Sequence, residues 1–228
     1  MSVRAAVVMA AGGTGRRMGG VRKQYLELAG EPLLLHALRP FLAQPAVKWV
    51  VVALPANDAE VPAWLARLDA RIRTVTGGAE RGDSVRAGLD AVPDDADVVL
   101  VHDAARPLVR AEVIERAIEE AGKGVGAVVA VRVADTIKVV ENGVVTGTAN
   151  RARLWQAQTP QAFPRAMLVD AYRRAAAEGV AATDDAALVE HYGGRVVVVE
   201  GDRSNLKVTT QSDLAVAEAL LRELRGRG

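Results

Sequence analysis

The sequence predicts an α/β fold built on a mostly parallel, twisted sheet. Short runs of apolar, largely β-branched residues recur at positions 3–9, 49–54, 72–75, 98–101, 126–131 and 196–199. Runs this short and continuously apolar are typical of strands that are buried on both faces of a parallel sheet. Segments in which apolar residues recur with helical spacing lie between them, so strands and helices alternate along the chain.

The first helices follow from this spacing. Residues 32–42 have a helical pattern, although Pro40 lies inside it and leaves its C-terminal end open. Val85, Leu89 and Val92 lie on one face of a second helix, and the apolar positions between 113 and 121 define a third.

The last two helices also carry start and stop signals. The Thr183 hydroxyl predicts an N-cap, with two acidic residues after it at the positive end of the helix dipole, and Gly193 followed by Gly194 predicts the end. Thr210 with Asp213 three residues later predicts a capping box for the final helix, whose leucine-rich face closes the core.

One stretch departs from the alternation. The β-rich runs 136–140 and 144–146 flank Asn142 and Gly143, and Asn-Gly between such runs is the strongest short-range hairpin signal. A lone hairpin is only marginally stable in water, so we expect this arm, at about 134–153, to pack on a second subunit or back onto its own domain. With no linker, low-complexity tract or long-period repeat, residues 1–228 are predicted to form a single domain with the arm as an insertion.

The composition excludes several classes of function. The chain has 29 Lys and Arg against 28 Asp and Glu, so its net charge of +1 gives no field that would attract nucleic acid or an anionic membrane. The absence of cysteine rules out disulfides and thiolate metal sites. The N-terminus has no long apolar leader, and no apolar run reaches about 18 residues. We therefore expect a cytoplasmic protein with local anion recognition.

A glycine-rich loop, AAGGTGRRMGG at 10–20, follows the first strand. Its small residues expose backbone N–H groups of the kind that cradle a polyphosphate. The spacing fits neither a dinucleotide fingerprint, whose third glycine would fall on Met18, nor a P-loop, which would need its second glycine at Arg17. The loop also carries basic residues without nearby acids: Arg16, Arg17, Arg22 and Lys23. Such a cluster favours an anionic ligand.

Three further clusters stand at strand ends, where open α/β sheets bind ligands. In VHDAARP at 101–107, Asp103 could bind Mg²⁺ or a ligand hydroxyl and Arg106 a phosphate, or the two could simply pair, while His102 is interpreted as structural. GGAERGDS at 77–84 could hold a base or sugar, although capping explains Ser84 almost as well. GDRSNLKVT at 201–209 places Lys207 beside the sheet edge. Together the clusters favour phosphoryl or nucleotidyl transfer assisted by Mg²⁺.

The motifs resemble those of one family along nearly the whole chain. They are AAG at 10–12, GRRM at 15–18, KQYL at 23–26, VHDAARP at 101–107, DTIK at 135–138, QTPQ at 158–161, TDDA at 183–186 and NLKVT at 205–209. In this order they resemble the 2-C-methyl-D-erythritol 4-phosphate cytidylyltransferases. The resemblance implies a three-layer, Rossmann-like nucleotidyltransferase architecture, a homodimer formed through a protruding β-hairpin arm, and a divalent cation, normally Mg²⁺. The implied reaction joins CTP to the polyol phosphate, with release of pyrophosphate.

The resemblance also implies roles for individual residues. The catalytic residues are Arg17, Lys23 and Lys207, of which the first two would stabilise charge at the α-phosphorus. The nucleotide-binding residues are Ala10, Ala11, Gly12, Gly13, Gly15, Gly78, Ser84, Ala104 and Ala105. The residues around the acceptor are Asp103, Arg106, Thr136, Arg151, Thr159 and Thr183. Arg151 matches an arm arginine that reaches the partner's substrate, and Asp103 is the one candidate metal ligand.

The chain departs from the family pattern at three places. The first loop is one residue longer than usual, Arg22 stands in place of a proline, and Ala79 stands where some members have an acid. Two alternatives remain open: ribitol 5-phosphate as the acceptor, because one methyl group contributes only about 1–3 kcal/mol of discrimination, and a non-catalytic nucleotide-binding regulator.

Overall fold

The computed structural model describes residues 2–12, 22–56 and 61–226, with the backbone alone for Lys23. In this part of the chain a seven-stranded sheet has the order β11-β7-β10-β6-β1-β4-β5. Its strands are β1 (Ala5–Ala10), β4 (Val47–Leu54), β5 (Ile72–Thr76), β6 (Val98–Asp103), β7 (Gly126–Arg132), β10 (Trp155–Pro164) and β11 (Val196–Glu200). The six strands expected from the apolar runs are therefore confirmed.

The seventh strand, β10, was not expected. It lies antiparallel between β6 and β7 and makes the sheet mixed. Its sequence has no β-branched run and contains Pro160, which normally argues against a central strand. The pairing of β10 with β7 is irregular between Ala157 and Gln161, so Pro160 stands where the hydrogen-bonded ladder is already interrupted.

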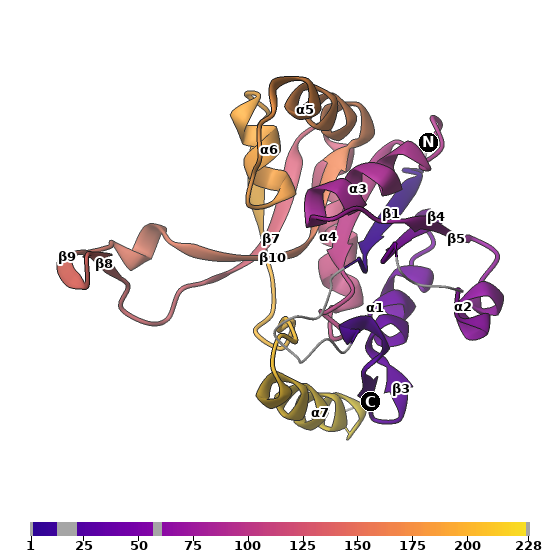
Figure 1. Ribbon diagram of the computed structural model, residues 1–228, viewed down its shortest axis with the longest axis horizontal. Coiled ribbons are helices and arrows are strands. Elements are labelled where there is room, and N and C mark those ends of the chain that lie inside the picture. Colours follow the sequence, from indigo (N-terminus) through magenta and orange to yellow (C-terminus); the bar gives the residue numbers. More distant parts are fainter. Residues whose placement is uncertain (1, 13–21, 57–60, 227–228) are drawn as a thin grey trace.

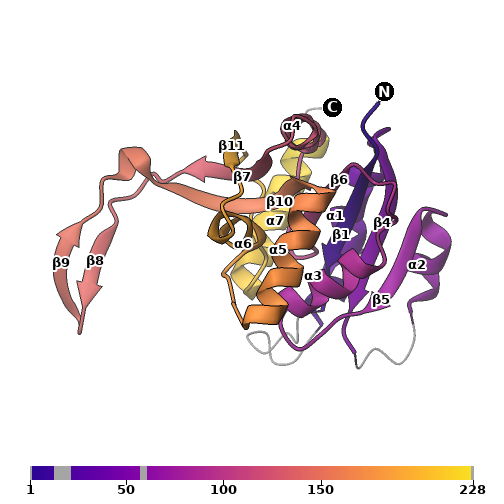
Figure 2. The same cartoon turned by 90° about the horizontal axis from the view of Figure 1, so that it is seen from above.

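Helices cover both faces of the sheet (Figures 1 and 2). The helices α3 (Arg81–Asp90), α5 (Arg165–Glu178) and α6 (Asp185–His191) pack on one face, and α1 (Leu33–Leu42), α2 (Ala63–Leu68) and α4 (Ala111–Gly122) on the other. β1 and β6 are buried along almost their whole length, as two-sided burial requires. A smaller cluster joins α7 (Gln211–Gly226) to the hairpin of β2 (Glu27–Leu28) and β3 (Glu31–Pro32).

The helix boundaries largely follow the expected signals. α1 continues through Pro40 to Leu42. The capping box of α7 is formed, because Asp213 N donates to Thr210 Oγ1 at 3.2 Å and Thr210 N donates to the Asp213 carboxylate at 2.8 Å. The predicted N-cap of α6 is wrong by one residue: Asp184, not Thr183, accepts from Ala187 N, because its carboxylate reaches the third residue beyond it.

The predicted hairpin is confirmed as β8 (Lys138–Glu141) and β9 (Val144–Thr148). Asn142 and Gly143 have φ values of 50° and 81°, as a tight two-residue turn requires. Figures 1 and 2 show the arm projecting away from the sheet. It therefore does not fold back onto its own domain. The division into one domain with an inserted arm stays a prediction.

Among residues 2–12, 22–56 and 61–226, no helix has the length and apolar character needed to cross a membrane.

Because α3 packs closely on β1, we expect alanine to have different effects on stability at two glycines of α3. A methyl group on Gly88 would lie 2.4 Å from Val8 Cγ1, whereas one on Gly82, in the same helix, would meet nothing within 4 Å. We expect Gly88→Ala to lower the free energy of unfolding by about 1–3 kcal/mol through overpacking. Gly82→Ala should leave it unchanged or raise it by up to about 1 kcal/mol, because alanine is the better helix former. Urea denaturation of both variants tests this, and equal effects would contradict the close packing.

Candidate active site

The site lies where the order of the sheet reverses. From β1 the chain continues to β4 and β5 on one side, and β6 lies on the other, so a crevice opens at the carboxyl ends of β1 and β6. Ala10 pairs with Asp103 at the ends of these strands, and Ala104 N donates to Ala10 O at 3.1 Å. The main chain therefore holds the loop after β1 against the loop after β6.

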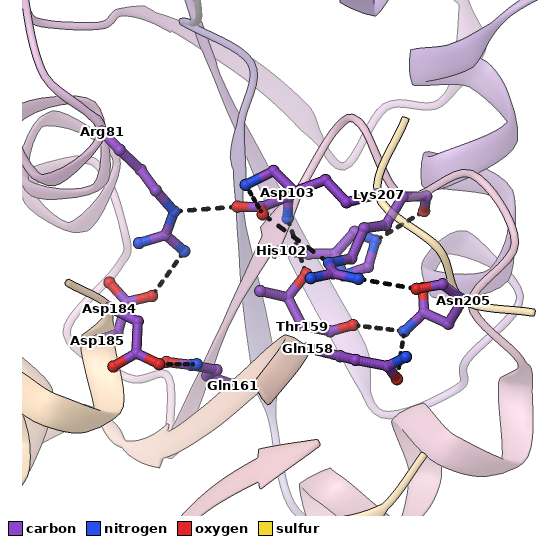
Figure 3. Close-up of polar contacts among 11 residues, drawn as sticks. Arg81, His102, Asp103, Gln158, Thr159, Gln161, Asp184, Asp185, Asn205 and Lys207 are labelled. Carbon is purple, nitrogen blue, oxygen red and sulfur yellow. Dashed lines mark hydrogen bonds and ion pairs between the residues drawn. The ribbon is translucent and has the colours of Figure 1, made fainter. Parts of the chain in front are cut away.

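Asp103, the last residue of β6, is the centre of the charged groups (Figure 3). Its Oδ1 accepts from Arg81 Nε at 3.0 Å, and its Oδ2 lies 2.7 Å from Lys207 Nζ. Arg106 Nε stands 3.9 Å from Oδ2. Burial raises the pKa of Asp103, but the charges of Arg81 and Lys207 outweigh it and hold that pKa well below its usual range. Asp103 is therefore a charged carboxylate although it is buried.

Arg81 connects Asp103 to a second buried carboxylate. Its Nη2 donates to Asp185 at 2.8 Å, and Tyr172 Oη donates to the other oxygen of Asp185 at 2.5 Å. Burial lowers the pKa of Arg81, but Asp185 and Asp103 raise it further than burial lowers it. Burial and the charge of Asp185 both raise the pKa of Tyr172, so its hydroxyl stays protonated. Tyr172, Asp185, Arg81, Asp103 and Lys207 thus form one chain of contacts, here called the charge chain.

Thr159 of strand β10 holds the Asp103 end of the charge chain in place. Asp103 N donates to Thr159 Oγ1 at 3.1 Å, and Thr159 Oγ1 lies 3.0 Å from His102 Nδ1. His102 Nε2 lies 3.1 Å from the carbonyl of Arg106, so we assign the ring proton to Nε2 and the Thr159 proton to the hydrogen bond with Nδ1. Burial lowers the pKa of His102 to about 4, which keeps the ring neutral. This geometry fits the structural role expected for His102.

Side-chain amide and guanidinium groups hold the loop that carries Lys207. Asn205 Nδ2 donates to the Thr159 carbonyl at 2.9 Å, Arg106 Nη1 donates to the Asn205 carbonyl at 2.8 Å, and Gln158 Nε2 donates to Asp202 O at 2.9 Å. Arg106 Nε is buried and has no hydrogen-bond partner among the described residues. Arg106 therefore keeps a donor at the site and pairs only loosely with Asp103.

Ser84 and Asp83 lie so close to three glycines of the loops after β1 and β5 that no side chain fits there. A methyl group on Gly12 would lie 2.6 Å from Ser84 Oγ, and one on Gly77 would lie 2.7 Å from it. Gly78 is closed in the same way by Asp83 Cβ at 2.2 Å. Ser84 is buried, but it does not cap α3, because Glu80 and Asp83 form that capping box instead. Only glycine fits where these two loops approach the start of α3.

The predicted site residues fall into four groups. Those brought together at the crevice are Ala10, Ala11, Gly12, Gly78, Ser84, Asp103, Ala104, Ala105, Arg106, Thr159 and Lys207. Thr183 lines a neighbouring cavity of about 580 Å³ together with Arg81. Thr136 and Arg151 lie on the arm, where Arg151 Nη1 donates to Ala134 O at 2.7 Å. Gly13, Gly15 and Arg17 lie outside the described residues, and Lys23 is placed by its backbone in η2 (Lys23–Tyr25).

Sequence reasoning missed Arg81, Asp185 and Tyr172. Arg81 stands inside the cluster 77–84, and Asp185 inside TDDA, where both acids were interpreted as helix-dipole partners. The signal for a buried pair between positions 81 and 185 was absent, because only the fold brings these positions together.

The described residues do not by themselves fit a divalent cation. No group of three or more His, Asp or Glu side chains gathers in the described part of the chain. Each oxygen of Asp103 already faces a cationic side chain, so a divalent cation bound there would be repelled by Arg81 and Lys207.

Comparisons with known proteins agree on one family. The family model described as "IspD: 2-C-methyl-D-erythritol 4-phosphate cytidylyltransferase" matches residues 5–223. The enzyme of that name from Symbiobacterium thermophilum is 46% identical over 98% of this chain and 95% of its own length. The one from Geotalea uraniireducens is 44% identical over 97% and 98%. These names favour methylerythritol phosphate over ribitol 5-phosphate as the acceptor.

Solved structures agree as well. The 2-C-methyl-D-erythritol 4-phosphate cytidylyltransferase of Thermus thermophilus superposes with a TM-score of 0.82 at 35% identity, covering 97% of this chain and 100% of that chain. The 4-diphosphocytidyl-2C-methyl-D-erythritol synthase of Anaerococcus prevotii gives 0.86 at 30% identity, covering 96% of each chain. The α/β fold and its hairpin arm are those of these enzymes.

The charge chain predicts a pH-dependent loss of stability in Arg81→Met. Without the guanidinium, Asp103 and Asp185 are buried carboxylates short of a partner, and we expect unfolding to become easier by about 3 kcal/mol or more at pH 7. The low pKa of Asp103 stabilises the native state above its unfolded pKa, and this contribution is lost as pH falls through the folded pKa. The deficit of the variant should therefore hold above about pH 5 and shrink as pH falls further below that value.

The matched control is Arg86→Met on the same helix, whose guanidinium is half exposed and 3.8 Å from Asp83. It should change the free energy of unfolding by about 0.5 kcal/mol or less. Urea titrations at several pH values provide the comparison, and a deficit for Arg81→Met that is small or independent of pH would count against the charge chain.

Proposed function

The chain belongs to the IspD family of 2-C-methyl-D-erythritol 4-phosphate cytidylyltransferases, and from this we propose how its residues divide the work of the reaction. It is a nucleotidyltransferase that transfers the cytidylyl group of CTP to 2-C-methyl-D-erythritol 4-phosphate. The products are CDP-methylerythritol and pyrophosphate, in the non-mevalonate route to isoprenoids. The observation that carries the proposal for this site is the charged Asp103 between Arg81 and Lys207, beside the glycine-rich strand ends.

Catalysis in this site is positioning plus electrostatic stabilisation. A phosphate oxygen of the acceptor attacks the α-phosphorus of CTP in line, and pyrophosphate leaves with the electron pair of the broken P–O bond. The attacking phosphate is already ionised, so the step needs no general base and no covalent intermediate with the protein. Neutral His102 and protonated Tyr172 agree with this, because neither is poised to exchange protons near neutral pH.

The nucleotide lies over the ends of β1 and β6. The backbone at Ala10, Ala11 and Gly12 and the adjoining loop at Gly78 receive CTP, since no side chain separates a ligand from the main chain there. We assign Arg17 and Lys23 to the charge that develops at the α-phosphorus, on the family resemblance.

The acceptor lies beside Asp103. Lys207 Nζ is partly exposed and held by Asp103, so it presents a fixed positive charge to the acceptor phosphate. Arg106 adds a second positive charge near Lys207, and Asp103 and Thr159 supply oxygen atoms that can accept from acceptor hydroxyls. Thr183 borders the cavity on the far side of Arg81.

We propose that a divalent cation, Mg²⁺ in the first instance, enters with CTP and is held by its phosphates. The cation neutralises charge on those phosphates when bound. This assignment agrees with the occupied oxygens of Asp103. We also place the reaction in the cytoplasm, where cells keep their nucleoside triphosphates.

We propose further that two chains pair through their arms. The arm carries exposed apolar side chains at Ile137, Val139, Val140, Val144 and Val145. Thr136 lies between β7 and β8 and Arg151 in η3 (Arg151–Arg153), both within the arm that projects from the sheet in Figure 1. In a homodimer they would complete the acceptor site of the partner.

Loss of one electrostatic donor should mainly lower turnover. We expect Lys23→Ala, and equally Arg17→Ala, to reduce pyrophosphate release by about 10²-fold or more with the fold intact. Lys48→Ala is the matched control, because Lys48 Nζ is exposed and donates only to Pro45 O. The assay uses CTP and Mg²⁺ with methylerythritol phosphate, and ribitol 5-phosphate as the comparison acceptor. Near-normal turnover in Lys23→Ala would remove its assigned role.

The arm proposal is tested by complementation. Arg151→Ala alone should impair use of methylerythritol phosphate. Co-expressed with Lys23→Ala, it should regain up to about a quarter of wild-type activity, because half of randomly paired dimers contain one site with both residues intact. If mixed dimers stay as inactive as either parent, Arg151 does not act on the partner's substrate.

A further inference from the structure

A second cavity lies at the other end of α3. It has a volume of about 800 Å³ and lies between the C-terminal end of α3, the loop that follows and the first turns of α5. Figures 1 and 2 show these two helices side by side on one face of the sheet. α3 starts at the active site with Arg81 and ends at Asp90, so most of this groove lies at the far end of the helix. Arg86 and Tyr172 line both this groove and the cavity beside Arg81.

The groove carries an excess of positive charge. Its arginines come from one strand and two helices: Arg73, Arg86, Arg165 and Arg173. The carboxylates that line it are Asp90 and Asp94. Four guanidinium groups thus face two carboxylates in a chain whose net charge is only +1.

Several donors in this groove have no partner. The side chain of Arg73 makes no hydrogen bond or ion pair with any residue that the structure describes. It lies two positions before Val75, which packs on the α3 side of the sheet, so its side chain leaves the strand on the same face. Arg165 Nε is buried without a hydrogen-bond partner in the described part of the chain. Its Nη2 contacts only Asp94, which is almost fully exposed.

The remaining two arginines are weakly engaged or exposed. Arg86 stands 3.8 Å from Asp83, whose carboxylate already serves the capping box of α3. Arg173 is exposed and pairs with Asp170 one turn earlier on its own helix. Apolar residues such as Leu89 and Val169 complete the lining. The groove therefore offers guanidinium donors beside an apolar surface.

We propose that this groove binds a small phosphorylated molecule, with its phosphate held by Arg73 and Arg165. Guanidinium groups bind phosphate oxygens in pairs of parallel hydrogen bonds. The Arg73 guanidinium has no partner among the described residues, and Arg165 pairs with a carboxylate that is almost fully exposed, so a phosphate competes with little at either side chain. The uncharged part of the molecule lies against Leu89 and Val169. Tyr172 also lines the groove, and its hydroxyl donates to Asp185, so the occupant lies next to the outer end of the charge chain.

Arginine side-chain NMR tests the proposal with inorganic phosphate as the probe. The Nε–H resonance of Arg165 is identified by its disappearance in Arg165→Gln. In the wild-type protein it should shift along a saturable curve as phosphate is added at constant ionic strength. Arg73→Ser should weaken the apparent binding about tenfold, the loss of one charge-assisted contact. Arg67→Ser, at an exposed position outside the groove, should leave it unchanged.

The outcomes separate the proposal from its rivals. No saturable shift of Arg165, or a shift that is the same in Arg73→Ser, would overturn it. Phosphate bound only at the active site would move resonances of Arg81 and Arg106 and leave Arg165 in place, which would also overturn it. Pyrophosphate release is a separate measurement, so failure here would leave the cytidylyltransferase assignment untouched.

Discussion

The structure depends on keeping one buried carboxylate charged. Asp103 is the last residue of β6, the middle strand of the sheet, and its burial alone would favour the neutral acid. The charged form persists because Arg81 comes from the start of α3 and Lys207 from the loop before α7. Arg81 is itself balanced by Asp185 on α6. Three segments far apart in the sequence must therefore dock together before any of these charges is satisfied.

A steric constraint acts at the same place. Ser84 lies under Gly12 and Gly77, so the loops after β1 and β5 can close on α3 only because both positions lack a side chain. The register of β1 with β6 then brings Ala10 level with Asp103. Backbone donors and charged side chains are thus held in position before substrates arrive, and such fixed dipoles stabilise developing charge without further rearrangement. The low pKa of His102 matters here too, because the neutral ring can accept from Thr159 at Nδ1 and leave the Thr159 oxygen to receive Asp103 N.

What the sequence predicts well is local. Apolar runs identify six strands, Asn142 with Gly143 identifies the hairpin, and Thr210 with Asp213 identifies a capping box, since each signal lies within a few residues of the structure it specifies. β10 was not predicted because pairing with β6 and β7, rather than its own composition, stabilises it as a strand. The role of Arg81 was not predicted either, because its partners, Asp103 and Asp185, are distant in the sequence. The roles of Arg17 and Lys23 rest on family resemblance and stay predictions.

The exposed β8–β9 arm bears on how two copies of the chain assemble. Two strands with no third to pair with bury little apolar surface, and in this arm the valines that would form a core face solvent. Such an element is stable only when another surface covers it, and the described part of its own chain does not turn back to do so. Arg151 and Thr136, which the family resemblance assigns to the acceptor, belong to this projecting arm. Exposed apolar surface and a pair of acceptor residues on the arm both find their explanation if a second chain receives the arm, so folding of the arm and completion of the acceptor site become one event.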